Sequence, residues 1–294
     1  MPAIERIGLV GAGLMGRGMA LNLLKAGYPV KLFIHRNRQR LDTVFAQGAT
    51  ETNDLQELAR RSDAIIICVD KAETVRSVVN DLLPALRPEH LLIDATTSDP
   101  AVTREIAEKM RLHEVSYADA PITGGPVQAE AGALGSLVGC AAATFPRVKN
   151  IVVNYSKAVR RIGDVGSGHF AKLLNNFVTH GTVTLLAEAY GRARENGVDW
   201  QALYAVMEAG AARSGTLEKM VKPALDGNFD GSQFFIRNAQ KDLAYFCRVA
   251  ASSERGASVL GETIRGVFDA AVAADLGERY VSALLDPEIR APGK

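Results

Sequence analysis

Three glycines near the start of the chain have the spacing that a dinucleotide-binding loop requires. Gly11, Gly13 and Gly16 form G-x-G-x-x-G within "IGLVGAGLMGRGMALNLLKAG" (7–27). The first glycine permits a tight turn, the second lets backbone approach a pyrophosphate, and the third lets a helix pack closely on a strand. A merely structural turn is the alternative, but the strand pattern before the loop and the helical pattern after it favour binding. We therefore expect Gly11, Gly13, Gly16, Leu14 and Met15 to bind a dinucleotide.

The end of the next predicted strand bears on which dinucleotide binds. NAD sites usually place Asp or Glu about 20 residues after the glycines, to bind the ribose 2′-hydroxyl. This chain has "HRNRQR" (35–40) there and no acid. Because a guanidinium suits a 2′-phosphate in charge and geometry, NADP(H) is favoured over NAD(H), with either His35 or Arg36 as the contact. A solvated basic loop is the alternative, and it accounts for Arg38 and Arg40.

The first half of the chain alternates short apolar runs with helical periods. The predicted strands cover residues 6–11, 29–34, 62–69, 90–96 and 115–121. This alternation predicts an α/β, Rossmann-type, mostly parallel sheet with right-handed crossovers. Ligands then gather at the carboxyl ends of the strands, where Val69 and Asp70 are expected to line the cofactor.

The pattern changes after the glycine-rich segment "GDVGSGHF" (163–170), beyond which only helical periods follow. A long helix is expected from about residue 168 to 196. We therefore divide the chain into a cofactor-binding Rossmann domain (1–163) and an all-helical C-terminal domain (164–294), joined by the long helix. Lys172, Asn176 and His180 recur at intervals of four on this helix and so share one face.

Composition excludes several classes of protein. The chain has 294 residues, which suits two domains, and 47% of them are hydrophobic and 23% charged, as in ordinary globular proteins. A formal charge of +1 gives no reason to expect nucleic acid or a membrane as a partner. No apolar run reaches the length of a membrane span. The three cysteines have no metal-binding spacing, so we expect reduced thiols, no metal and a cytoplasmic protein.

Four segments together resemble the β-hydroxyacid dehydrogenases, which include 3-hydroxyisobutyrate dehydrogenase, tartronate semialdehyde reductase and glyoxylate/succinic semialdehyde reductases. They are the glycine segment, "DAPITGG" (119–125), "GSGHFAKLLNN" (166–176) and "QKDL" (240–243). The similarity covers nearly the whole chain, in the family's order. It implies reversible hydride transfer between a nicotinamide and the alcohol carbon of a small hydroxy acid. It also implies a C-terminal domain that forms a homodimer or homotetramer.

The resemblance also implies roles for the residues of the catalytic helix and the substrate loop. Lys172 would be the catalytic acid/base, and Asn176 would hold the reacting oxygen. Thr123, Gly124 and Gly125 would bind the substrate carboxylate. The family usually has Ser at position 123, and the extra methyl group of Thr narrows the pocket.

Further matches place residues beside the cofactor and the substrate. Thr97 would lie beside the nicotinamide and Lys241 would contact the cofactor, while Asp242 would orient that site. Arg213 stands in "GAARSGT" (210–216), where small residues are common. It faces either the distal end of the substrate or solvent.

Three functions remain open at this point. The favoured one is an NADP(H)-dependent oxidoreductase that interconverts a small 3-hydroxy (or 2- or 4-hydroxy) acid and its semialdehyde or keto acid. The alternatives are an NAD-linked 3-hydroxyisobutyrate-type dehydrogenase and a non-catalytic NADP(H)-binding protein. Retention of Lys172, Asn176 and the Thr-Gly-Gly loop together favours an enzyme. The particular acid and the physiological direction stay open.

Overall fold

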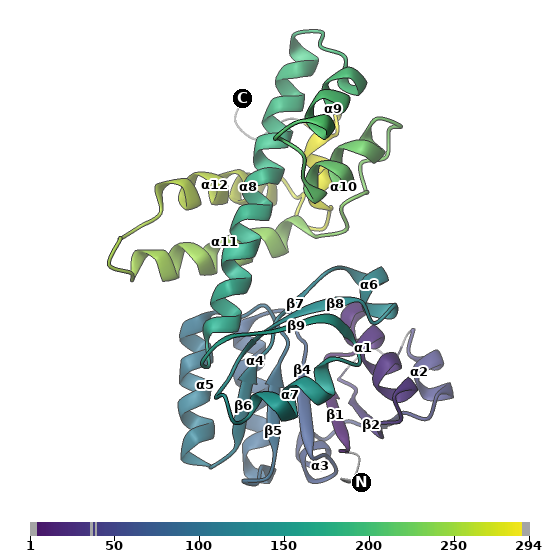
Figure 1. Cartoon of the computed structure of the whole chain (residues 1–294), viewed down its shortest axis with the longest axis vertical. Coiled ribbons are helices and arrows are strands. Elements are labelled where there is room, and N and C mark those ends of the chain that lie inside the picture. Colours follow the sequence, from purple (N-terminus) through teal and green to yellow (C-terminus); the bar gives the residue numbers. More distant parts are fainter. Residues whose placement is uncertain (1–4, 36–37, 39, 290–294) are drawn as a thin grey trace. The chain divides into compact units, whose positions relative to one another are not determined.

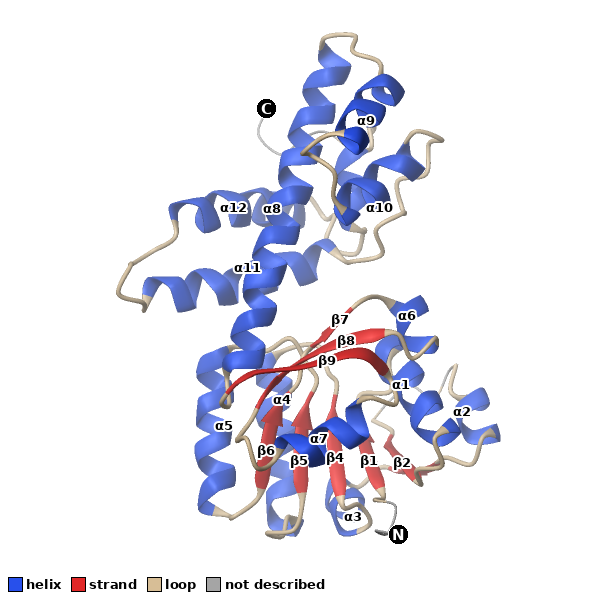
Figure 2. Cartoon of the chain, viewed as in Figure 1, coloured by secondary structure: helices blue, strands red, loops and turns tan. Residues whose placement is uncertain are grey.

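The computed structural model describes residues 5–35, 38 and 40–289, and it confirms the predicted succession of a sheet domain and a helical domain. The chain forms two compact units, Met1–Lys172 and Leu173–Lys294. Figure 1 follows the chain through both units, and Figure 2 distinguishes the strands of the first from the helices of the second. None of the helices in the described ranges is long and apolar enough to cross a bilayer.

The first unit contains one sheet of nine strands within the described residues, in the order β3-β2-β1-β4-β5-β6-β8-β7, with β9 pairing with β8. The strands are β1 (Ile7–Val10), β2 (Val30–Phe33), β3 (Thr50–Thr52), β4 (Ala64–Ile67), β5 (Leu91–Asp94), β6 (Ser116–Asp119), β7 (Ile122–Thr123), β8 (Leu134–Gly139) and β9 (Ser156–Gly163). The strands from β3 to β6 are parallel, and β8 runs antiparallel to β6 and β7. The carboxyl ends of the parallel strands β1 to β6 therefore share one edge of the sheet.

Helices connect these strands and cover the sheet (Figure 2). They are α1 (Leu14–Lys25), α2 (Asp42–Ala46), α3 (Leu55–Arg60), α4 (Ala72–Leu82), α5 (Pro100–Leu112), α6 (Pro126–Glu130) and α7 (Phe145–Val152), with a 3₁₀ turn at Leu83–Ala85. Helix α5 begins at an Asp-Pro pair: the Asp99 side chain accepts the Ala101 N–H, and Pro100 occupies the first helical position. The central strands β1, β4 and β5 are buried throughout, which explains their unbroken apolar sequences.

Four strands were not predicted from the sequence: β3, the two-residue β7, β8 and β9. The edge strand β3 is only three residues long, and β8 and β9 extend the sheet beyond β6. Most residues of β9 are at least partly exposed, so the strand has no apolar signature. Pairing with β8 holds it in place, and such pairing cannot be inferred from a local pattern.

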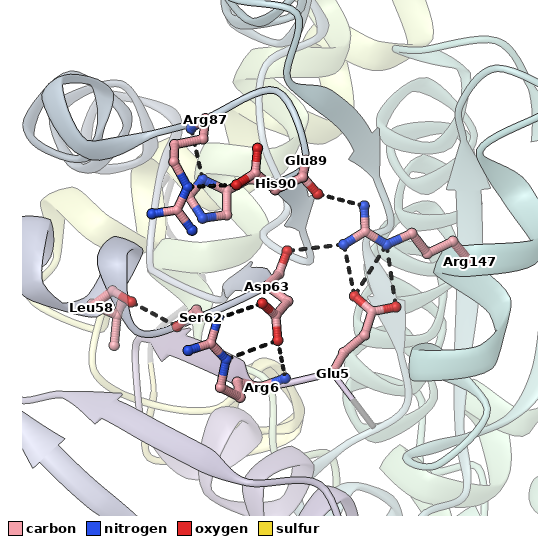
Figure 3. Close-up of polar contacts among 9 residues, drawn as sticks. All are labelled: Glu5, Arg6, Leu58, Ser62, Asp63, Arg87, Glu89, His90 and Arg147. Atoms are coloured by element: carbon pink, nitrogen blue, oxygen red, sulfur yellow. Dashed lines mark hydrogen bonds and ion pairs between the residues drawn. The ribbon is translucent and has the colours of Figure 1, made fainter. Parts of the chain in front are cut away.

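The amino edge of the sheet is held by a network of charged groups (Figure 3). The Arg147 guanidinium in α7 donates to both oxygens of Glu5 at 2.8–3.2 Å and to the backbone carbonyls of Asp63 and Glu89. The Arg6 side chain donates to both oxygens of Asp63, at 3.0 and 2.6 Å. The segments that precede β1, β4 and β5 are thereby tied together at the end of the sheet opposite the predicted ligand site.

The second unit is helical, as predicted. It holds most of α8 (Ser167–Glu195), then α9 (Trp200–Ala209), α10 (Gly215–Ala224), α11 (Ile236–Ala251), α12 (Val259–Ala273) and a 3₁₀ turn at Val281–Leu285. Tyr190, Met220 and Phe268 are among the buried side chains of its own apolar core. Each unit therefore has a separate hydrophobic core.

Candidate active site

The glycine loop connects β1 to α1 at the carboxyl edge of the sheet, and each glycine has a local reason. Gly11 adopts φ +97°, and a Cβ there would collide with the carbonyl oxygen of Cys68. A Cβ on Gly16 would collide with the carbonyl oxygen of Gly11, so α1 can approach β1 only without that atom. Around Gly13 there is open space, as a loop that admits a ligand requires. The G-x-G-x-x-G spacing is therefore accounted for by close backbone approaches and an open side.

A cavity of about 730 Å³ opens beside this loop. It brings together six of the predicted cofactor residues: Gly11, Gly13, Leu14, His35, Val69 and Asp70. The remaining walls are Val10, Ala12, Arg17, Phe33, Ile34, Arg40, Leu55, Thr74, Ser77, Val78 and Asp81. Its volume lies in the range of small-molecule and cofactor sites.

The other predicted cofactor residues that the structure describes are not among the residues that line this cavity. Met15 packs against the hydrophobic core, and Gly16 acts through the backbone contact described above. Thr97 follows β5 and is half-buried, whereas the hydroxyl of its neighbour Thr96 accepts the Val69 N–H at 3.2 Å. Arg36 lies outside the described residues, so the choice between His35 and Arg36 stays a prediction.

The two described arginines after β2 have different surroundings. Arg38 donates to Glu51 at 2.9 Å and its guanidinium lies 4.5 Å from the centre of the Phe45 ring. Arg40 lines the cavity with its backbone at φ +70°, and its carbonyl oxygen accepts a hydrogen bond from Arg17 at 2.9 Å. The basic loop therefore contains one arginine that is already paired and one at the cavity wall.

Several cavity residues were missed by sequence reasoning. Thr74, Ser77 and Asp81 recur every three or four residues on α4, which starts at the carboxyl end of β4. That spacing indicates a polar helix face directed toward the strand ends, and it was available in the sequence. No such signal marks Arg17 or Arg40, because their positions depend on how α1 and the basic loop pack.

Lys172 and Asn176 are both buried on α8, one helical turn apart, and Lys172 is only 7% exposed. Lys172 is the last residue of the first unit. In the second unit, the Asn176 amide donates to Asp242 at 2.6 Å, and the other oxygen of Asp242 lies 3.0 Å from the Lys241 ammonium. Asp242 therefore orients the Asn176 amide and neutralises Lys241.

A buried polar cluster lies where α8 begins. The Asp94 carboxylate, at the end of β5, accepts the Thr96 N–H at 3.0 Å and the Tyr117 hydroxyl at 3.4 Å. Burial raises the pKa of Asp94, and burial together with the two nearby carboxylates raises that of Tyr117 well above its ordinary value. Asp119 and His169 complete the cluster and are fully buried.

In the predicted substrate loop, one backbone N–H group, that of Gly125, already has a hydrogen-bond partner. Thr123 ends β7, Gly124 adopts φ +110°, and the Gly125 N–H donates to the side chain of Gln128 at 3.0 Å. A Cβ on Gly135 would collide with the Thr123 hydroxyl. The Thr123 hydroxyl and the Gly124 N–H are then the groups of this loop that a carboxylate could use.

Comparisons with known proteins agree with this geometry. Residues 6–163 match the NAD binding domain of 6-phosphogluconate dehydrogenase, and residues 166–287 match the NAD-binding domain of NADP-dependent 3-hydroxyisobutyrate dehydrogenase. The chain is 30% identical over 286 residues to 2-(hydroxymethyl)glutarate dehydrogenase of Eubacterium barkeri, covering 95% of this chain and 93% of that protein. It is 29% identical to 3-hydroxyisobutyrate dehydrogenase of Pseudomonas aeruginosa over 92% of this chain and 93% of that protein.

The solved structure of Mycobacterium tuberculosis 3-hydroxyisobutyrate dehydrogenase with L-serine superposes with a TM-score of 0.88 and 25% identity, over 98% of this chain and 100% of that one. This chain belongs to the 3-hydroxyisobutyrate dehydrogenase family. It is therefore a dehydrogenase that acts on the CH–OH group of a hydroxy acid and uses a nicotinamide cofactor. The non-catalytic alternative is set aside.

His180 and Arg213 have different surroundings in this member of the 3-hydroxyisobutyrate dehydrogenase family. His180 packs against the rings of Phe234 and Phe268, at centroid distances of 5.1 and 5.6 Å. Arg213 lines a second, smaller cavity of about 420 Å³, together with Tyr204, Glu208, Ser214, Gly215, Leu217 and Glu218. The apolar surroundings of His180 favour a packing role, whereas Arg213 stands in a concave polar site.

Proposed function

We propose that this enzyme is an NADPH-dependent reductase of small carbonyl acids, with Lys172 as the general acid/base. The observation that carries the proposal is a buried lysine on the helix that starts at the carboxyl edge of the sheet, the edge where the glycine loop and its cavity open. A side-chain acid that is held within hydrogen-bond reach of a developing alkoxide can donate its proton to that oxygen in the transition state. In this proposal the Rossmann domain (1–163) binds the cofactor, and the all-helical domain (164–294) contributes the Asn176–Asp242 pair.

The chain's own residues then have distinct tasks. When bound, the nicotinamide supplies or accepts the hydride. In reduction, the Lys172 ammonium donates a proton from Nζ to the alkoxide oxygen, and in oxidation the neutral amine takes it back. One N–H of the Asn176 amide is held by Asp242, which leaves the second N–H for the substrate oxygen. Thr97 beside the nicotinamide and Lys241 beside the cofactor remain part of this proposal.

A preference for NADPH follows from the wall of the cavity at the end of β2. The wall contains His35 and Arg40 and has no acidic residue at the position that binds a ribose 2′-hydroxyl. Arg38 is engaged by Glu51, so we assign the 2′-phosphate to His35, Arg40 and Arg36 rather than to Arg38. No metal takes part in this mechanism.

The substrate carboxylate is assigned to the Thr123–Gly124–Gly125 loop. A hydroxyl and a backbone N–H in a loop with positive φ form a concave donor site for an anion. A semialdehyde or keto acid bound there would present its carbonyl carbon to the cofactor. In the oxidative direction, the substrate is the corresponding 3-hydroxy, 2-hydroxy or 4-hydroxy acid.

Arg213 favours a second candidate, a substrate with another anionic group. The cavity around Arg213 is polar, and the name of the Eubacterium barkeri relative specifies a hydroxy acid with two carboxyl groups. Glu208 and Glu218 line the same cavity and would be repelled by a second carboxylate. A dicarboxylic substrate would therefore have to bind through the guanidinium while avoiding both glutamates.

We also propose that the enzyme is a cytoplasmic homodimer or homotetramer. Leu174, Val178 and Leu185 form an apolar stripe on one face of α8, and Val178 and Leu185 are 65% and 72% exposed. Such a stripe is typical of a helix face covered by a partner. All three cysteines are free thiols, which supports a reducing compartment. Val178→Glu should shift the sedimentation coefficient toward that of a monomer, and an unchanged value would contradict this assignment.

The experiment that tests the function is a reductase panel with both cofactors. Glyoxylate, succinic semialdehyde, tartronate semialdehyde and methylmalonate semialdehyde would each be assayed with NADPH and with NADH. We expect a higher kcat/KM with NADPH for at least one of them. A tenfold preference for NADH, which corresponds to about 1.4 kcal/mol, would favour the NAD-linked dehydrogenase instead.

A further inference from the structure

The first turn of α8 is held by a carboxylate that belongs to another element. Asp119 is the last residue of β6, and its Oδ1 accepts the Gly166 N–H at 2.6 Å while its Oδ2 accepts the His169 N–H at 2.7 Å. The N–H groups at a helix start have no partner within the helix. A carboxylate there also interacts favourably with the helix dipole. Asp119 therefore attaches the beginning of α8 to the carboxyl end of β6.

Two glycines pack closely around Asp119 and the start of α8. A Cβ on Gly168 would collide with the carbonyl oxygen of Leu137 in β8, and a Cβ on Gly139 would come within 2.5 Å of Oδ1 of Asp119. At Gly168 the helix start therefore approaches β8 through bare backbone. This contact has little slack, because neither the glycine nor the carbonyl group can relieve it by changing a side-chain rotamer.

His169 provides a second attachment from the same helical turn. Its Nδ1 lies 2.7 Å from the Thr103 hydroxyl on α5, and its Nε2 lies 3.8 Å from a carboxylate oxygen of Asp94 at the end of β5. All four side chains are fully buried. The first turn of α8 is thus fixed to β5, β6 and α5, all within the first unit.

Lys172 follows His169 by three residues, on the next turn of the same rigid helix. We propose that Asp119, with His169 as a second attachment, is a positioning residue that sets where the Lys172 ammonium stands at the carboxyl edge. This inference rests on the proposed role of Lys172 as general acid. A general acid must be held within a fraction of an ångström of its productive position, so a loosened helix start lowers the rate without altering cofactor binding.

The test variant is Asp119→Asn, which keeps one acceptor oxygen and loses the other. We expect kcat for the best carbonyl substrate of the panel to fall about ten- to a hundredfold, as misplacement of a catalytic group does. The dissociation constant of NADPH should stay unchanged, because the residues that line that cavity lie between β1 and the end of α4, far from Asp119 in the chain.

A double-mutant cycle separates positioning from general structural support. If Asp119 acts through Lys172, adding Asp119→Asn to Lys172→Ala should lower kcat no further. Additive losses would overturn the proposal. An unchanged kcat in Asp119→Asn alone would also overturn it.

Asp63→Asn is the matched control, because Asp63 likewise accepts hydrogen bonds with both carboxylate oxygens, from the backbone N–H and the guanidinium of Arg6, but lies at the amino edge. It should leave kcat unchanged. Hydrogen exchange of the peptide spanning residues 164–172 should be faster in Asp119→Asn and unchanged in Asp63→Asn. This readout does not depend on activity, so it tests the attachment even if Lys172→Ala retains activity and the proposed function fails.

Thr103→Val supplies a milder variant should Asp119→Asn fail to fold. It removes the partner of His169 Nδ1 while keeping the volume of the side chain. We expect kcat to fall several-fold, with unchanged NADPH affinity and faster exchange at residues 164–172. Unchanged kcat and exchange in this variant would overturn the role of His169.

Discussion

The two edges of the parallel sheet use charged residues in opposite ways. At the amino edge, Arg6, Asp63, Arg147 and Glu5 neutralise one another, and their side chains are partly exposed. At the carboxyl edge, Asp119 is fully buried and its oxygens are bonded to backbone N–H groups of α8. Ion pairs between partly exposed groups stabilise a fold modestly, whereas buried polar groups beside a cavity hold reactive groups in place.

The two edges of the sheet also differ in where glycines lie. Gly11, Gly16, Gly139 and Gly168 all stand where backbone meets backbone near the carboxyl edge. No described residue of the Arg147 network is a glycine (Figure 3). These four close approaches lie at the edge that holds the glycine-loop cavity and the start of the helix that carries Lys172. We therefore predict that variants at the two edges will have separable effects.

The largest expected effect is at Lys172. Lys172→Ala should lower kcat for carbonyl reduction by at least about a hundredfold, because a positioned general acid contributes that much. The affinity for NADPH, measured by fluorescence titration, should be little changed. Lys172→Arg keeps the charge but cannot readily release a proton, so it should be almost as impaired. Retention of most activity in Lys172→Arg would mean that the proton comes from another group.

The next effect is on stability at the amino edge. Arg147→Ala removes the hydrogen bonds to Glu5, Asp63 and Glu89 and should lower the free energy of unfolding by about 1–3 kcal/mol. Urea denaturation measures this change, and kcat should stay unchanged. Arg111→Ala is the control, because Arg111 pairs with Glu108 on an exposed helix surface and should cost less than about 0.5 kcal/mol. Equal losses in the two variants would refute the special role of the Arg147 network.

A smaller effect distinguishes the two arginines of the basic loop. Arg40→Asn should lower kcat/KM for NADPH about tenfold and leave that for NADH nearly unchanged, because it removes one charge-assisted contact to the 2′-phosphate. Asn tolerates the positive φ of this position. Arg38→Asn, which loses the Glu51 pair and the contact with the Phe45 ring, should change neither value. If kcat/KM for NADPH fell in Arg38→Asn and not in Arg40→Asn, the 2′-phosphate contact would belong to Arg38.

The smallest effect is the response of the amino edge to acid. The Arg6 guanidinium holds the pKa of Asp63 at about 2, below its ordinary 3.8. The stabilisation from this carboxylate is therefore complete above about pH 4 and is lost as the pH falls toward 2. The difference in unfolding free energy between the native protein and Asp63→Asn should shrink over that interval. If this difference in unfolding free energy were the same at pH 7 and pH 2, the stabilising role of the Asp63 carboxylate would be contradicted.

Much of the carboxyl edge could be inferred from local spacing. The β1–Gly11–α1 loop, the strands around it and the four-residue spacing of Lys172 and Asn176 are periodic features of neighbouring residues. Such features depend on backbone geometry alone, which is why the fold class was correct. The Asp99 helix cap was predictable for the same reason, since its partner is two residues away.

The remaining features depend on residues far apart in the chain. Asp119 stands in a quoted motif, yet its partners Gly166 and His169 are 47 and 50 residues away. Arg40 and Arg38 are nearly adjacent in sequence, but packing places only Arg40 at the cavity wall. β9 depends on its pairing with β8. Local sequence specifies helices, strands and tight turns because their hydrogen bonds are short-range, whereas these contacts exist only after the sheet has assembled.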